Sequence, residues 1–217
     1  MSDHRQGKRR RGREATTGAI LEAAQELFSE RGDHAVSVRE IAEHAGVTHA
    51  LVHQYVGRKA DIFRTVLARN EKTILAAAPG NPDLLESAGL MLRQGLTEKG
   101  RVQPRLVARS ALSGLRYDRT SGRFEATERL VELALQAAAS ASPAERAGKD
   151  LDPRLVVAGV VALYIGWVAT ESWLRPATGL EDMGHAELAD QLVQLTRGML
   201  KDNVPGAAHS DAQGDTA

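Results

Sequence analysis

Residues 46–59, with the sequence GVTHALVHQYVGRK, bring together several side chains that can do chemistry. His49 and His53 lie four residues apart, and Gln54 and Tyr55 follow them directly. Imidazole, carboxamide and phenol groups can bind a metal ion, transfer protons or hydrogen-bond to the edges of nucleic-acid bases. The first question is which of these chemistries the surrounding residues support.

A metal site has little support beyond the histidine spacing. His49 and His53 have the i, i+4 spacing of two ligands on one helix. The chain has no cysteine, and the acidic residue that follows, Asp61, lies one helix later. Catalysis would require a nucleophile with a base or a pair of carboxylates, and residues 46–59 contain neither. We therefore predict no metal site, no catalytic site and no cofactor.

The residues around this stretch predict the two short helices that would position it. Ser37 and Glu40 have the spacing of a capping box before a helix that ends at Gly46. Thr48 is a good cap for a second helix, over 49–55. Two short helices joined by a tight turn at a glycine form a helix-turn-helix. This motif covers about residues 37–56.

The outward face of the second helix suits the reading of DNA. Its side chains combine polar tips that donate or accept hydrogen bonds with one small residue that permits close approach. Groups at the rim of the face would reach phosphates. The face carries His49, Ala50, His53 and Gln54, with Tyr55 and Lys59 at its rim. The alternative is a purely structural helix-turn-helix whose polar face is only solvated.

Helical periodicity continues along the rest of the chain, and strand alternation is nearly absent. We predict an all-α protein of about nine helices. Their expected ranges are 16–31, 38–45, 49–55, 59–78, 83–99, 103–116, 122–140, 153–175 and 185–202. Residues 203–217 lack apolar periodicity and are predicted to be a disordered tail.

Charge is balanced overall, with 28 Lys and Arg against 28 Asp and Glu, but it is unevenly distributed. Within Met1–Arg13 six residues are basic and one is acidic. We predict a disordered basic arm over residues 1–12, serving either as an arm for a polyanion or as a solubilising tail.

The composition also points to a cellular compartment. The absence of cysteine fits a reducing cytoplasm. The most apolar run, Leu155–Ala169, has fifteen residues, fewer than the ~20 that span a bilayer. We read it as a buried helix and predict a cytoplasmic protein without a membrane segment.

At this point the chain resembles the TetR family of bacterial one-component transcription regulators. The segments ILEAAQELFSERG and SVREIAEHAGVTHALVHQYVGRKADIF follow the family's order and spacing over about Arg13–Phe63. The resemblance implies a DNA-binding domain over 13–63 and a ligand-binding and dimerisation domain over 64–202. It further implies a homodimer that binds a palindromic operator and releases it when a small-molecule effector binds.

Two residues depart from the family pattern. His53 stands where a Tyr is common, and Val56 replaces a Phe that usually follows the Tyr, which reduces packing onto the first helix. The complete set of predicted DNA contacts is Arg13, Ser37, Arg39, Thr48, His49, Ala50, His53, Gln54, Tyr55 and Lys59.

The C-terminal domain offers a candidate interface and a candidate pocket. Small residues on one stripe of the 153–175 helix and a leucine seam on the 185–202 helix favour a four-helix dimer interface, made of Gly159, Ala162, Gly166, Thr170, Leu188, Leu192, Leu195 and Met199. Packing of the same stripes within one chain is the alternative. Candidate pocket residues are Met91, Arg109, Leu112, Tyr117, Phe124, Trp167 and Trp173, any of which may instead belong to the plain core or a solvated face.

The function predicted from these features is a ligand-responsive, DNA-binding repressor. Its partners would be a double-stranded DNA operator, a second copy of the chain and an unidentified small molecule. The alternatives are an activator of the same family, a helical enzyme or a protein-interaction module. The chain shows no phosphate loop or nucleophile–base pair that would favour an enzyme.

Overall fold

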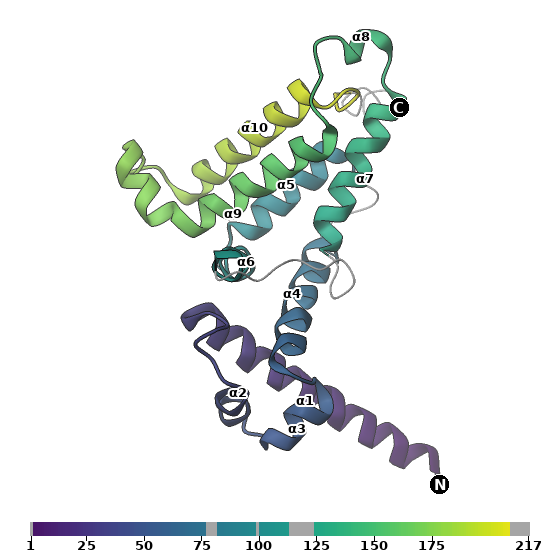
Figure 1. Cartoon of the computed structure of the whole chain (residues 1–217), viewed down its shortest axis with the longest axis vertical. Coiled ribbons are helices and arrows are strands. Elements are labelled where there is room, and N and C mark those ends of the chain that lie inside the picture. Colours follow the sequence, from purple (N-terminus) through teal and green to yellow (C-terminus); the bar gives the residue numbers. More distant parts are fainter. Residues whose placement is uncertain (1, 77–81, 99, 113–123, 209–217) are drawn as a thin grey trace. The chain divides into compact units, whose positions relative to one another are not determined.

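The computed structural model describes the backbone of residues 2–76, 82–98, 100–112 and 124–208, and side chains in these ranges except for 2–11 and 70–76. Within these ranges the chain forms ten α-helices and no strand (Figure 1). They are α1 Ser2–Arg31, α2 Val38–His44, α3 His49–Tyr55, α4 Lys59–Ala76, α5 Leu84–Gly95, α6 Val102–Leu112, α7 Glu125–Ser140, α8 Pro143–Arg146, α9 Pro153–Thr178 and α10 His185–Asn203. The predicted all-α class is confirmed. The short helix α8 was missed because a single turn shows no apolar periodicity.

Helix α1 is longer than the sequence predicted. Its backbone is helical from Ser2, through the range 2–12 in which we expected a disordered arm. Lys and Arg are good helix formers, and a helix that has already nucleated adds residues at little cost. The basic residues therefore continue the first helix instead of leaving it.

The described residues pack as two compact units, and their division differs from the predicted boundary. The first unit holds residues 2–70 and 105–112, and the second holds the others. Residues 105–112 were expected in the C-terminal domain, 64–202. They belong with α1 because Leu106 is fully buried in the first core, and because Arg109 donates to the carbonyl oxygens of Ser29 (3.4 Å) and Glu30 (3.0 Å) at the end of α1.

The first core lies where α1, α2, α3 and α4 meet. Phe28 of α1 and Phe63 of α4 pack edge to face with ring centroids 5.6 Å apart. Helix α3 contributes Val52, which is fully buried. The other buried members include Ile20, Ala24, Ile41, Ala42, Ile62 and Val66. This packing leaves one face of the short helix α3 in contact with the core and the other in solvent.

The second core lies among α5, α7, α9 and α10. Helices α9 and α7 pack against each other, and α10 packs along α5. Gly89 of α5 lies close to Val193 of α10, since a Cβ placed on the glycine would be 3.4 Å from a valine methyl. Gly95 makes room for the phenol of Tyr164, and a Cβ there would lie 1.8 Å from the hydroxyl oxygen.

The segment after α10 was predicted to be disordered from residue 203, and its described part is not. Val204 is fully buried and Ala207 is 5% exposed, both within the second core. Gly206 has a φ of 74°, and a Cβ there would lie 2.4 Å from the carbonyl oxygen of Ala137 on α7. Two apolar side chains and a glycine turn are therefore enough to hold this segment on α7. The rest of the predicted tail, 209–217, lies outside the described residues.

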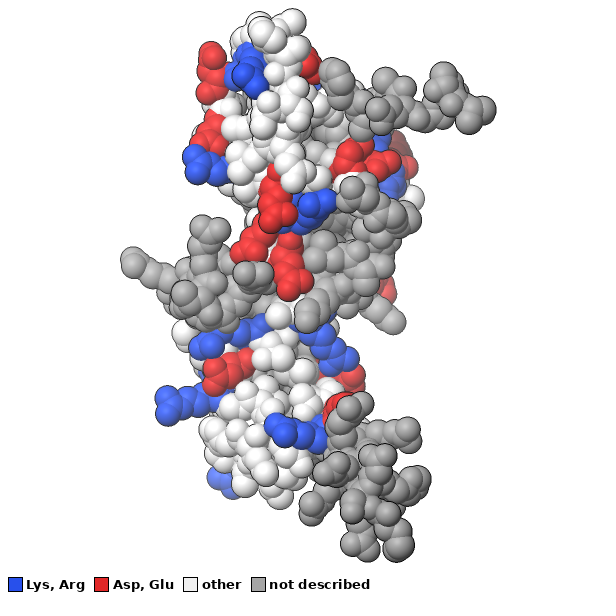
Figure 2. Space-filling view, turned by 90° about the vertical axis from the view of Figure 1, so that its right-hand side faces the viewer, with Lys and Arg blue, Asp and Glu red and all other residues white. Residues whose placement is uncertain are grey.

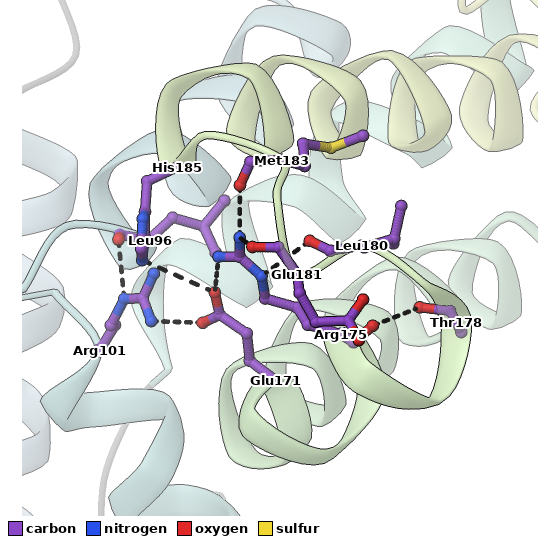
Figure 3. A network of polar contacts seen from close by, with 9 residues as sticks. All are labelled: Leu96, Arg101, Glu171, Arg175, Thr178, Leu180, Glu181, Met183 and His185. Atoms are coloured by element: carbon purple, nitrogen blue, oxygen red, sulfur yellow. Dashed lines mark hydrogen bonds and ion pairs between the residues drawn. The ribbon is translucent and has the colours of Figure 1, made fainter.

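A buried ion-pair network joins two connections of the second unit (Figure 3). Glu171 is 6% exposed, within the otherwise apolar helix α9. Its carboxylate pairs with Arg101, just before α6, and with Arg175 one turn later at 3.5 Å. Arg175 in turn donates to carbonyl oxygens of the α9–α10 connection, namely those of Leu180, Glu181 and Met183. One carboxylate thus ties the start of α6 to the end of α9 and the loop behind it.

Helix α9 is half-buried, where the sequence predicted a buried helix. Val157, Val160 and Val168 face the core with 1% exposure each. The opposite face is open, with Leu155 61% and Trp173 69% exposed. By length and composition α9 is the one helix among the described residues that is long and apolar enough to cross a membrane. It packs against α7 and α10 and leaves its other face open, and a single helix of this kind is weak evidence for a membrane segment.

Candidate nucleic-acid interface

The capping box predicted before α2 is present. The backbone N–H of Glu40 donates to Ser37 Oγ at 3.2 Å, and the backbone N–H of Ser37 donates to Glu40 Oε2 at 2.8 Å. The backbone N–H and the hydroxyl of Ser37, together with Arg31, hold the pKa of Glu40 below its usual value. Since the Ser37 hydroxyl also donates to Glu40, at 2.8 Å, its first role is to fix the start of α2.

The turn between α2 and α3 is built around Gly46, which has a φ of 66°. A left-handed conformation here is readily adopted only by glycine, and it ends α2 sharply. The N–H of Val47 donates back to the carbonyl of Ala42 at 2.9 Å, and Thr48 Oγ1 accepts from the N–H of Leu51 at 3.4 Å. The predicted helix-turn-helix is therefore formed with both caps in place.

Helix α3 presents the predicted reading face to solvent. Its four polar or small residues are all exposed, while Val52 on the opposite side is buried: they are His49, Ala50, His53 and Gln54. The two imidazole rings pack edge to face with centroids 4.5 Å apart. The helical period thus brings hydrogen-bonding tips together on one accessible surface.

The rim of this face is formed by residues that also touch the body of the unit. Tyr55 is half-buried, and the guanidinium carbon of Arg13 on α1 lies 5.3 Å from its ring centroid. Lys59 is half-buried, and its Nζ donates to the carbonyl oxygen of His34 at 3.4 Å. Arg39 on α2 and Thr48 are exposed. Arg13, Tyr55 and Lys59 therefore have partners inside the protein in addition to their predicted roles toward phosphate.

Asp61 has a structural role that the sequence reading did not identify. Its Oδ2 accepts from the backbone N–H of Arg58 at 2.9 Å, so it closes the turn that begins α4. Gly57 in this turn has a φ of 108°, and the space beside it is filled by the Asp61 carboxylate. The signal was available, since an acidic residue in the first turn of a helix commonly caps it. No group of three or more metal-ligating side chains occurs among the described residues.

Charged side chains are interspersed on the face seen in Figure 2. Lys and Arg border an uncharged area on the lower part of this view, with Asp and Glu among them. Over residues 1–70 the sequence has 12 Lys and Arg against 9 Asp and Glu, so the excess of positive charge in this part is small. Among the described side chains on this face, cations that could contact phosphates therefore lie beside anions.

The candidate pocket residues lie in different local environments. Arg109 lies in the first unit, while Leu112 is 90% and Trp173 is 69% exposed. Met91 is buried in the second core, with Trp167 packed against the same cluster. Phe124 is half-buried at the start of α7, and Tyr117 lies outside the described residues. Periodicity alone cannot tell a residue facing a neighbouring helix from one facing solvent, so the pocket stays a prediction.

The candidate interface residues divide into two groups. Leu188 and Leu192 are 4% and 6% exposed and belong to the chain's own core, so the intramolecular alternative holds for them. The other six are exposed or half-buried: Ala162, Gly166, Thr170 and Leu195 are exposed, and Gly159 and Met199 are half-buried. The leucine seam of α10 is thus divided between the chain's own core and an exposed Leu195, because its spacing suits any apolar partner helix, within the chain or outside it.

Comparison with known proteins shows the family to which this helix-turn-helix belongs. Residues 20–66 match the family described as bacterial regulatory proteins, tetR family. An HTH-type transcriptional repressor of Mycobacterium tuberculosis is 34% identical over 179 residues, which cover 82% of this chain and 85% of the relative. The chain belongs to the TetR family. It is a transcription regulator that binds DNA, and not an enzyme.

Solved structures support the same fold for this TetR-family regulator. A TetR-family regulator from Rhodococcus has a TM-score of 0.60 at 16% identity, covering 85% of this chain and 98% of the other. NalD from Pseudomonas aeruginosa, the secondary repressor of the MexAB-OprM multidrug efflux pump, has a TM-score of 0.54 at 26% identity, with coverage of 88% and 96%. The likeness extends over both units, including the C-terminal helices, which lie outside the residues matched by the family.

Proposed function

We propose that this TetR-family regulator is a homodimeric repressor that binds a palindromic operator through α3 and releases it when a small-molecule effector binds. The observation that carries the proposal is the exposed face of α3, capped at Thr48 and held by Val52. A short helix of this kind enters the major groove, where Gln54 can bond an adenine edge at two points and a histidine can contact guanine or a phosphate.

Repression is favoured by the names of the relatives. The mycobacterial relative that spans most of this chain is called a repressor, and so is NalD. An activator of the family would use the same DNA-binding face, so the structure of α3 does not separate the two. Transcription from the bound promoter separates them, because a repressor lowers transcript yield when added to purified RNA polymerase and an activator raises it. DNA binding also implies action in the cytoplasm.

Dimerisation is supported by the open face of α9. Ala162, Gly166 and Thr170 are exposed along this helix, with Leu195 of α10 52% exposed. Small residues let two helices approach closely, and exposed leucine gains from being covered. Two copies of α9 and α10 would form a four-helix interface. Two recognition helices then meet half-sites about 34–36 Å apart, which requires one fixed separation in the dimer.

Release by an effector follows from this geometry. A small molecule that binds more tightly to a dimer with another separation weakens DNA binding by its difference in affinity for the two states. The second unit, with the core formed by α5, α7, α9 and α10, is the part of the chain that would bind it.

The decisive experiment is a titration of the purified protein against its own upstream intergenic DNA and against a scrambled duplex of equal length. We expect a palindromic site to be bound, with affinity that falls steeply as salt rises, because phosphate contacts release counterions. Equal affinity for both duplexes at every salt concentration would contradict sequence-specific binding. Footprinting of the bound duplex gives the half-site spacing.

Replacing Gln54 by alanine should relax the base preference. The variant loses a bidentate contact worth about 1–3 kcal/mol per half-site, so discrimination falls at one position of each half-site while binding to scrambled DNA stays unchanged. Selection of sites from a randomised duplex pool measures this directly. Ser37→Ala is a useful comparison, since its hydroxyl caps α2 and its loss should weaken binding without changing the preferred base. An unaltered preference in Gln54→Ala would mean that Gln54 does not read a base.

A further inference from the structure

One contact ties the exposed beginning of α1 to the recognition helix. The guanidinium carbon of Arg13 lies 5.3 Å from the centroid of the Tyr55 ring. From Gly12 to Ala19 no described side chain is buried, and the buried face of α1 begins at Ile20. Arg13 therefore lies beyond the part of α1 that the core holds in place. A cation over an aromatic ring at this distance is attracted to the ring's negative face.

Helix α3 is held by its packing against α1 and α2. It has seven residues, from His49 to Tyr55, and Val52 is the buried one among them. A helix this short is not stable in isolation, so its position depends on the contacts it makes with the rest of the unit. Tyr55 and Val56, at its end, are partly buried and pack against the first core. The position of the Tyr55 ring therefore helps to set the position of the last turn of α3.

We propose that Arg13 is a positioning residue for the recognition helix, and that it acts on DNA binding through the Tyr55 ring. The inference rests on the proposed role of α3 in reading DNA. Its consequence is that Arg13, which the sequence placed among direct DNA contacts, supports the readout of bases without supplying a phosphate contact of its own. A phosphate contact and a positioning contact differ in what they do to salt dependence and to specificity.

The test uses Arg13→Gln in three backgrounds: wild type, Tyr55→Phe and Tyr55→Leu. Phe keeps the aromatic face and loses the hydroxyl, whereas Leu loses both. Affinity is measured on the duplex that the wild-type protein selects from a randomised pool and on a scrambled duplex. A positioning role predicts that Arg13→Gln weakens binding to the selected duplex by about 5- to 30-fold for the dimer. Affinity for scrambled DNA and the salt slope should stay unchanged.

The double variants separate stacking from charge. Arg13→Gln should cost as much in the Tyr55→Phe background as in wild type, and less than about twofold in the Tyr55→Leu background, because the ring is then missing. Arg13→Lys, which retains a cation over the ring, should recover part of the affinity. Arg64→Gln makes the same charge change on an exposed arginine of α4 that pairs with Asp61, and it controls for loss of charge alone.

A measurement on the free protein tests the inference without DNA. Hydrogen exchange at the amides of α3 should quicken in Arg13→Gln and at least as much in Tyr55→Leu, which also loses the packing of the ring against the core, and no further in the double variant than in Tyr55→Leu. Unchanged exchange in Arg13→Gln overturns the proposal, whether or not an operator is found. So does a uniform loss of affinity for both duplexes with a salt slope lowered by about one, which is the behaviour of a phosphate contact. Failure of the wild-type protein to select any duplex would contradict the proposed function instead.

Discussion

Gly166→Arg is expected to prevent formation of the proposed homodimer and to leave a monomer. Gly166 is exposed in the middle of α9, and nothing lies within 4 Å of a Cβ placed on it, so the folded chain has room for the larger side chain. Arginine is also a better helix former than glycine, which leaves the monomer at least as stable. In the proposed interface the same side chain would bring a charge to a close helix–helix contact. Light scattering coupled to gel filtration reports the mass.

The loss of the dimer should also reduce DNA binding. A monomer engages one half-site and loses the avidity of two linked modules, so affinity for the operator should fall by about 100-fold or more. Gly166→Ala is the matched control, and it should remain dimeric. Gln136→Arg, on the exposed face of α7, introduces the same charge outside the stripe. A Gly166→Arg protein that still elutes as a dimer would place the interface elsewhere.

Glu171→Ala should lower the free energy of unfolding by about 3–5 kcal/mol, because removing one member of a buried ion pair leaves the other charge without compensation. Two cations are affected here, since Arg101 and Arg175 share this carboxylate and have side chains only 14% exposed. Urea unfolding followed by circular dichroism measures the change. The network holds the start of α6 and the α9–α10 loop, so hydrogen exchange in Glu171→Ala should rise first at these two segments.

Glu181→Ala is the control for this change, because only the backbone carbonyl of Glu181 accepts from Arg175. Its stability should stay within about 0.5 kcal/mol of the wild-type protein, as is usual for a surface substitution. Glu171→Gln keeps the shape of the side chain and one acceptor oxygen, so its loss of unfolding free energy should lie between those of Glu171→Ala and Glu181→Ala. Equal unfolding curves for Glu171→Ala and Glu181→Ala would mean that the network contributes nothing to stability.

The helix-turn-helix shows which structural features can be predicted from residues that are close together in the sequence. Capping at Ser37 and Thr48 and the glycine turn at Gly46 depend on residues within four positions of one another, and all were predicted correctly. The exposure of Gln54 and the burial of Val52 follow from the helical period once these ends are fixed. The partners of Arg13 and Lys59 were not predictable, because they lie 42 and 25 residues away along the chain.

The C-terminal unit shows which features a local sequence pattern cannot predict. An apolar stripe indicates that a helix face will be buried, but it does not identify the helix that packs against it. The leucines of α10 and the open face of α9 are both regular stripes, yet Leu192 is buried in the chain's own second core and Gly166 faces solvent. Similarly, Glu171 looks like the charged end of an apolar run and is in fact buried against two arginines from other positions.

By itself, then, the sequence determined the helical class, the caps and glycine turn of the helix-turn-helix, and the family, because residues a few positions apart carry the helical period, the caps and the family motif. Tertiary structure alone decided which apolar faces are free, how residues 105–112 join the first unit and which cations have partners. The physical reason is that side-chain burial depends on contacts between distant segments, and hydrophobic attraction has no direction that a local pattern can record.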